Sequence, residues 1–218
     1  MGQALINVNG DGVQTLEILF LLTTVSLLPS ILVMMTSFTR IIIVLSFLRN
    51  AMGVQQVPPN MVLIGISLFL TFFIMSPVIE DINTQAYIPY KSEQISQSQA
   101  LERAQIPLKK FMLKQTEVST LNMYAEFAGE KISSDINKLP MKIVVPAFMT
   151  TELKRAFIIG FLLFIPFLLI DMIVSSTLMS MGMMMLPPTM IALPFKLLLF
   201  ITIDGWNLLF STLIKGFN

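Results

Sequence analysis

The 218-residue sequence contains no cysteine and no histidine. Their absence excludes thiol catalysis, zinc sites built from Cys and His, and acid–base catalysis by imidazole. Glycine-rich phosphate-binding loops are also missing, and no serine and lysine are placed as a nucleophile and its base. We therefore expect a protein that is not an enzyme and that needs neither a cofactor nor a metal ion.

Charged residues are also scarce. They make up 12% of the chain, against roughly 25% in an ordinary soluble domain, while hydrophobic types make up 55%. Lipid or a very large buried interface must therefore replace water over much of the surface. The net charge of +1 indicates no nucleic-acid partner. Met1–Leu16 has no Lys or Arg, so we expect a mature form or insertion through the first long apolar segment.

Four long apolar runs account for this composition. The first, Ile18–Thr39, has 22 residues without a charge, which as a helix span about 33 Å and cross a hydrocarbon core of roughly 30 Å. The runs lack the alternation of a membrane β-barrel, so we predict helices, whose backbone satisfies its own hydrogen bonds. The other three predicted helices are Met61–Ile79, Ala156–Leu178 and Met190–Ile214.

The segment between the second and third apolar runs is different, because residues 81–155 hold 18 of the 27 charged side chains. The sequence thus predicts an all-α membrane protein in which two apolar helical hairpins flank a mainly helical extracytoplasmic domain. Its parts are an N-terminal segment at 1–17, the first hairpin at 18–80, the polar domain at 81–155 and the second hairpin at 156–218.

Within the polar domain, residues 85–99 have the polar composition of a loop. Apolar spacing predicts one or two amphipathic helices at 100–128, with Pro107 as a break or a first helical residue. Prolines predict an extended stretch at 139–148, and we expect Thr151 to cap the third membrane helix.

The orientation signal comes from the first turn. Arg40 and Arg49 flank it, which favours a cytoplasmic location for this turn. The polar domain then lies outside the cell membrane, and its basic residues do not oppose this, since loops beyond about 60 residues translocate largely regardless of charge.

The turns of the two predicted hairpins resemble each other. Each has a Pro-Pro pair followed by Asn60 or Thr189, which we expect to cap the returning helix. Two explanations stay open: short membrane turns often use these residues, or a helical hairpin was duplicated.

The second turn is rich in methionine. Seven of the 17 methionines of the chain lie between Met172 and Met190. Because methionine is flexible and polarizable, a ring of such turns can close around a variable peptide. The alternatives are a lipid-facing or core-filling turn, and Cu(I) binding by thioethers, which the lack of Cys and His disfavours. The candidate sealing residues are Met179, Met181, Met183, Met184 and Met185.

Three charges lie inside the predicted apolar helices: Asp171, Lys196 and Asp204. Such groups are costly in lipid and normally face a partner or a wet cavity. Asp171 and Lys196 are equally far from the middle of the second turn, so an antiparallel hairpin brings them to one depth, where they can pair. Lys196 and Asp204 are eight residues apart, near one helix face. A structural pair and a proton relay are both open, and no chain of carboxylates supports the relay.

Nine motifs in order along the chain resemble the FliP/SctR family of type III export gates. The match covers nearly all of 18–214 and is weakest in 81–140. The motifs are Leu22–Pro29, Met35–Ile41, Leu48–Gly53, Gln56–Asn60, Pro146–Phe148, Glu152–Lys154, Ile165–Asp171, Leu193–Phe200 and Asp204–Trp206. The methionine run resembles the flagellar branch more than the injectisome branch.

This resemblance implies a function that composition does not show. Family members form homo-oligomers, expected to be pentamers, with FliQ and FliR in the inner membrane at the flagellar basal body. They act with FlhB and pass unfolded flagellar proteins. Carried over, Met183, Met184 and Met185 form a gasket around the closed pore, and Asp171 and Lys196 are buried charges. The alternatives are the equivalent injectisome subunit or a solute transporter or channel, for which three intramembrane charges are thin support.

Overall fold

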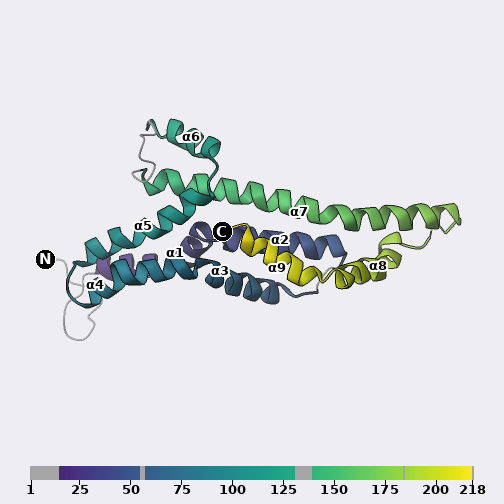
Figure 1. The fold of residues 1–218 in the computed structure, drawn as a ribbon, viewed down its shortest axis with the longest axis horizontal. Coiled ribbons are helices and arrows are strands. Elements are labelled where there is room, and N and C mark those ends of the chain that lie inside the picture. The colour runs from purple at the N-terminus through teal and green to yellow at the C-terminus, as the bar shows by residue number, and fades with distance from the viewer. Residues whose placement is uncertain (1–14, 55–56, 131–138, 184, 218) are drawn as a thin grey trace.

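The computed structural model describes residues 15–54, 57–130, 139–183 and 185–217. Every regular element in these ranges is helical, which confirms the all-α prediction. Figure 1 shows an elongated molecule in which α7 is the longest element. The elements are α1 (Thr15–Met35), α2 (Phe38–Met52), α3 (Asn60–Ile82), η1 (Asn83–Tyr87), α4 (Ile88–Lys91), α5 (Gln97–Gln115), α6 (Val118–Phe127), α7 (Met141–Ser180), α8 (Pro188–Thr202) and α9 (Gly205–Lys215).

Two hairpins organise these helices, as predicted, but the first arm of the first hairpin is α2 rather than the predicted Ile18–Thr39, most of which is α1. The first pairs α2 with α3, the second pairs α7 with α8, and α2 and α7 pack along each other (Figure 1). The close approach of α2 and α7 depends on Gly160, where an added Cβ would lie 2.5 Å from Cγ of Phe47. Small residues let apolar helices approach in this way when lipid gives no hydrophobic driving force between them.

The described residues form two apolar cores. One lies among α2, α3, α7, α8 and α9, and includes Ile41, Leu45 and Leu213. The other lies where α5, α6 and the start of α7 meet, and includes Met112 and Phe148. The polar middle segment is thus packed on the membrane-type helices through its own core.

Two helices run further into the polar segment than the sequence predicts. The second apolar run continues as one helical rod from Asn60 to Lys91, so the predicted loop at 85–99 begins only after Lys91. The third helix begins at Met141, so the extended stretch predicted for 139–148 is wrong. Thr151 is no cap, because it lies inside α7 and its hydroxyl donates to the carbonyl of Ala147 at 2.9 Å. The predicted domain boundary at 155–156 therefore falls inside one continuous helix.

The amphipathic part of the polar segment forms two helices, α5 and α6. Ser96 starts α5 with a reciprocal capping box with Gln99. Pro107 lies inside α5 and neither breaks nor starts it; the break comes after Gln115.

By length and composition, Asn60–Lys91 and Met141–Ser180 are each able to cross a membrane. Two bent pairs are able to do the same if each pair counts as one span: Val25–Met35 with Phe38–Met52, bent by 70°, and Pro188–Thr202 with Gly205–Lys215, bent by 61°. The predicted first and fourth helices are thus real but bent. These apolar helices confirm the prediction of a membrane protein.

Candidate functional site

The methionine-rich turn joins α7 to α8 and lies at one end of the molecule, the end opposite α4 (Figure 1). A glycine ends α7 there: Gly182 has a φ of +74°, and its N–H donates to the carbonyl of Met179 at 3.0 Å. The N–H of Met183 donates to the carbonyl of Leu178 at 3.0 Å, which completes a Schellman motif. The turn is therefore capped by its own backbone and leaves its side chains outside.

The predicted sealing residues face away from the chain. Met179, Met181, Met183 and Met185 are all exposed, and Met185 is 98% exposed. These four side chains fill no core of the single chain, which leaves lipid, a partner or a pore as their surroundings. Met184 lies outside the described residues.

Asp171 of α7 and Lys196 of α8 lie at one depth of the hairpin, and Lys196 Nζ is 2.6 Å from Asp171 Oδ2. Lys196 is only 4% exposed, and its ammonium also donates to the carbonyl of Ala51 at 3.0 Å. One lysine thus ties α8 both to α7 and to the end of α2. The second hairpin is therefore anchored on the first.

The third predicted buried charge differs. Asp204 is exposed in this chain, at the bend between α8 and α9, with a φ of +49°. The run predicted as one straight helix breaks here, so Lys196 and Asp204 do not share a continuous helix face. Among the described residues, the carboxylate of Asp204 accepts a hydrogen bond from Asn207 Nδ2 at 3.3 Å, and its backbone carbonyl accepts one from the N–H of Leu208 at 3.1 Å.

The predicted helix caps at the two Pro-Pro turns are not made. No side chain caps α3 or α8. Asn60 instead accepts a hydrogen bond from Arg49, so it fixes the end of α2 to the start of α3.

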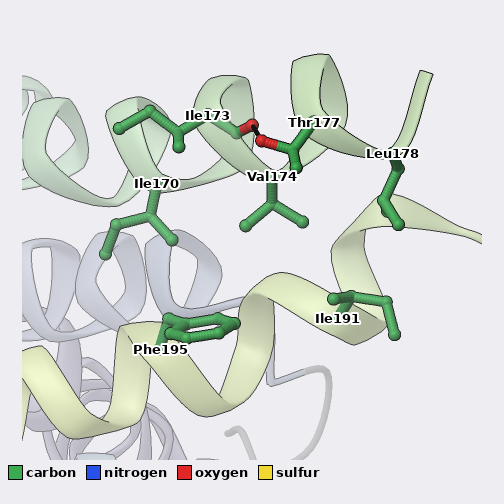
Figure 2. Close-up of a pocket in the computed structure, with 7 residues that line it drawn as sticks. All are labelled: Ile170, Ile173, Val174, Thr177, Leu178, Ile191 and Phe195. Carbon is green, nitrogen blue, oxygen red and sulfur yellow. Dashed lines mark hydrogen bonds between the residues drawn. The ribbon is translucent and has the colours of Figure 1, made fainter. Parts of the chain in front are cut away.

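An apolar groove of about 410 Å³ runs between α7 and α8 on the way to the turn (Figure 2). In Figure 2 the hydroxyl of Thr177 donates to the carbonyl of Ile173 at 2.8 Å, so it offers no free donor to the groove. The lining residues are Ile170, Ile173, Val174, Thr177, Leu178, Ile191 and Phe195. The groove suits apolar groups, and no group of three carboxylates suited to a metal ion occurs in the described part of the chain.

A second charged centre, which the sequence did not predict, surrounds Arg40. Arg40, used above only as an orientation signal, is 2% exposed and pairs with Glu152 of α7. Its Nη1 donates to the carbonyl of Gly216 at 3.1 Å, and its guanidinium lies 3.7 Å from the centre of the Phe217 ring. The available signal was the single arginine inside a long apolar run. With Arg40 buried, only Arg49 remains as an orientation signal at the first turn.

A family model, described as the FliP family, matches residues 21–213 of the chain. The chain belongs to the FliP family. The match includes both turns, the ion pairs of Arg40 with Glu152 and of Lys196 with Asp171, and the bend at Asp204, and it confirms the family that the nine motifs predict.

Relatives in the FliP family are about half identical to this chain. Flagellar biosynthetic protein FliP of Pectobacterium carotovorum subsp. carotovorum is 51% identical over 211 residues, which cover 96% of this chain and 82% of the relative. The protein of the same name from Bacillus subtilis (strain 168) is 51% identical over 203 residues, 93% of this chain and 92% of the relative.

A third FliP-family relative is considerably longer. Flagellar biosynthetic protein FliP of Buchnera aphidicola subsp. Acyrthosiphon pisum (strain APS) is 50% identical over 212 residues, 95% of this chain but 56% of the relative. The chain thus spans little more than half of that protein.

Proposed function

We propose that this chain is a pore-forming subunit of the flagellar type III protein export gate in the bacterial inner membrane. Several copies, expected to be five, assemble with FliQ and FliR and act with FlhB. Unfolded flagellar proteins pass through the centre, and the polar segment lies on the extracytoplasmic side. Membership of the FliP family and the flagellar name of its relatives support this proposal.

The observation that carries the proposal is the exposed methionine turn at the end of an anchored hairpin. Lys196 fixes the hairpin to α2, while Met179, Met181, Met183 and Met185 project from the turn. Methionine side chains are flexible and adapt to irregular partners. Several such turns around an axis would close on each other at rest and reshape around a passing polypeptide.

Large exposed apolar surfaces on α7 support the assembly of several copies. Phe161, Leu168 and Ile173 are exposed in the single chain, and such surfaces require lipid or protein as a neighbour. The groove beside the turn adds to this surface.

Site-directed cross-linking tests the proposed pore. The chain has no cysteine, so Met185→Cys gives each copy of this chain one thiol at a known position. A flagellar export substrate fused to a tightly folded domain stalls in the gate, and a thiol-reactive group on its unfolded part reports contact. Phe69→Cys on α3, which is 79% exposed, is the matched control. We expect cross-linking at position 185 and not at 69. Cross-linking at 69 alone, or equally at both, would contradict the proposal.

A further inference from the structure

The charges in the apolar part of the chain do not all find partners within it. Two ion pairs are complete: Arg40 with Glu152, and Lys196 with Asp171. Several other charges in the same part of the chain have no oppositely charged partner among the described residues. Two of them are Asp204 at the α8–α9 bend and Arg49 near the end of α2, which hydrogen-bond only to neutral groups.

Asp204 is presented outward by a rigid bend. Its left-handed backbone is a conformation that residues other than glycine seldom adopt, so the surrounding packing must hold it. The next residue, Gly205, has no room for a Cβ because the ring of Phe200 occupies that space. Phe200 in turn packs edge-on against Trp206, with ring centres 5.2 Å apart. The bend is thus fixed by packing and holds the carboxylate at the surface.

The surroundings of Asp204 are apolar. Ile201, Ile203 and Leu208 are exposed near it in the sequence, and in the described part of the chain its carboxylate bonds to a neutral group, the amide of Asn207. A carboxylate in such surroundings is costly in lipid and is normally paired with a cation. The surface therefore requires a neighbouring protein that brings a positive charge.

Arg49 is a cation that has no carboxylate partner among the described residues. Its Nη1 donates only to neutral oxygens, those of Pro58 and Asn60, and its buried Nε has no partner in the described residues. Arg49 also lies near the level of Asp204, because the adjacent Leu48 lines the same 330 Å³ cavity as Ile203. If copies are arranged in parallel around an axis, Asp204 of one copy and Arg49 of the next lie at similar heights along that axis.

We propose that Asp204 of one copy pairs with Arg49 of the neighbouring copy and so sets the spacing of subunits in the ring. This inference rests on the proposed function, in which several copies of the chain form a ring, and it adds one contact between neighbouring copies. A guanidinium suits this role, because its fork of donors can keep the neutral partners of Arg49 and still bind a carboxylate. The occupant of the surface at the bend is therefore a second copy of this chain.

Charge exchange tests the pair. Asp204→Arg and Arg49→Asp each place like charges together and should lower recovery of the complex about tenfold or more, whereas the variant with both exchanges should recover to within about twofold of the original. Complex size after mild solubilisation is measured for each variant. Recovery of the double variant supports the pair, and equal loss in the double and the single variants overturns it.

Cross-linking between copies gives a second readout, which reports directly whether positions 204 and 49 of neighbouring copies are close. Chains with Asp204→Cys and a first tag are expressed with chains carrying Arg49→Cys and a second tag, and a short bis-maleimide is added, since an Arg–carboxylate pair exceeds the reach of a disulfide. Leu198→Cys replaces Asp204→Cys in the control. We expect a dimer with both tags from position 204 and not from 198. A complex of normal size without that dimer overturns the contact alone, while original chains that stay monomeric overturn the proposed function and the contact together.

Discussion

Arg40 of α2 and Glu152 of α7 form a buried ion pair between residues 112 positions apart in the sequence. Arg40 Nε donates to Glu152 Oε2 at 2.8 Å, and the same guanidinium reaches Gln115 of α5 and the carbonyl of Gly216. Both hairpin regions and the polar segment therefore meet at one side chain. A planar, permanently charged fork is suited to hold several acceptors in this way.

Breaking this centre should destabilise the chain strongly. Arg40→Ala leaves the Glu152 carboxylate buried without its cation, which costs about 3–5 kcal/mol. The double variant Arg40→Met with Glu152→Leu should lose less than the sum of the single losses. Denaturant unfolding in detergent measures these changes. Lys154→Ala is the control, because its pair with Glu117 is solvent-exposed and worth about 1 kcal/mol or less. Losses of equal size for Arg40→Ala and Lys154→Ala would contradict the role of the centre.

The pair between Asp171 and Lys196 should be coupled in assembly. Asp171→Ala leaves the Lys196 ammonium buried with only the carbonyl of Ala51, and Lys196→Ala removes both contacts. Each change should reduce the yield of complex, and the double variant should lose less than the sum. Asp171→Asn keeps a hydrogen-bond acceptor for Lys196, so its yield of complex should lie between that of Asp171→Ala and that of the original chain. Strict additivity in this double-mutant cycle would show that the two residues act independently.

The α2–α7 contact should tolerate no side chain at Gly160. Gly160→Ala places a Cβ 2.5 Å from Cγ of Phe47, next to the backbone of α2, where the ring has little freedom to move. Overpacking of this kind costs about 1–3 kcal/mol. Gly65→Ala is the control, since an added Cβ there meets nothing within 4 Å and should stabilise α3 by about 0.5–1 kcal/mol. Thermal unfolding in detergent compares the two variants. An unfolding midpoint for Gly160→Ala at or above that of Gly65→Ala would contradict the close approach.

The chain should require detergent or partner subunits to remain folded and dispersed. Apolar residues of α7 such as Phe157, Phe161 and Leu168 are exposed over much of its length. A contiguous exposed apolar surface along a helix causes association in water. Size-exclusion chromatography with and without detergent measures the outcome, and a folded, monodisperse monomer in plain buffer would contradict this account.

Much of the fold follows from apolar patterning. The lengths of the apolar runs and the positions of the charged residues predict the helices and both hairpins. Asp171 and Lys196 are equally far from the second turn, which predicts one depth for both, and the structure places Lys196 Nζ 2.6 Å from Asp171 Oδ2. The helix ends are harder to predict, since α3 continues as a helical rod beyond Glu80 and α7 begins before the apolar run. Polarity changes along a helix where it leaves an apolar environment, but the helix itself need not end there.

The bends and the Arg40 centre could not be read from local sequence. The bend at Asp204 depends on packing of Phe200 against Gly205 and Trp206, which an apolar run does not reveal. Arg40 contacts Glu152 and Gly216 only in the tertiary structure. Thr151 precedes an apolar run, which predicts a cap, but α7 begins ten residues earlier, at Met141, and Thr151 lies inside it. Long-range partners override local signals at these positions.

The methionine turn provides the central test, which is the ion conductance of the resting gate. An apolar constriction blocks ions by excluding water, and methionine adds adaptability to that seal. Met183 to Met185 are replaced together by glycine or by leucine in cells that express the whole gate, and the yield of complex is measured alongside conductance. Met61→Gly, which changes an exposed methionine at the other Pro-Pro turn, is the control. We predict an assembled but leaky gate with glycine, a largely retained seal with leucine, and no leak in the control. An assembled glycine variant with normal conductance would contradict the sealing role.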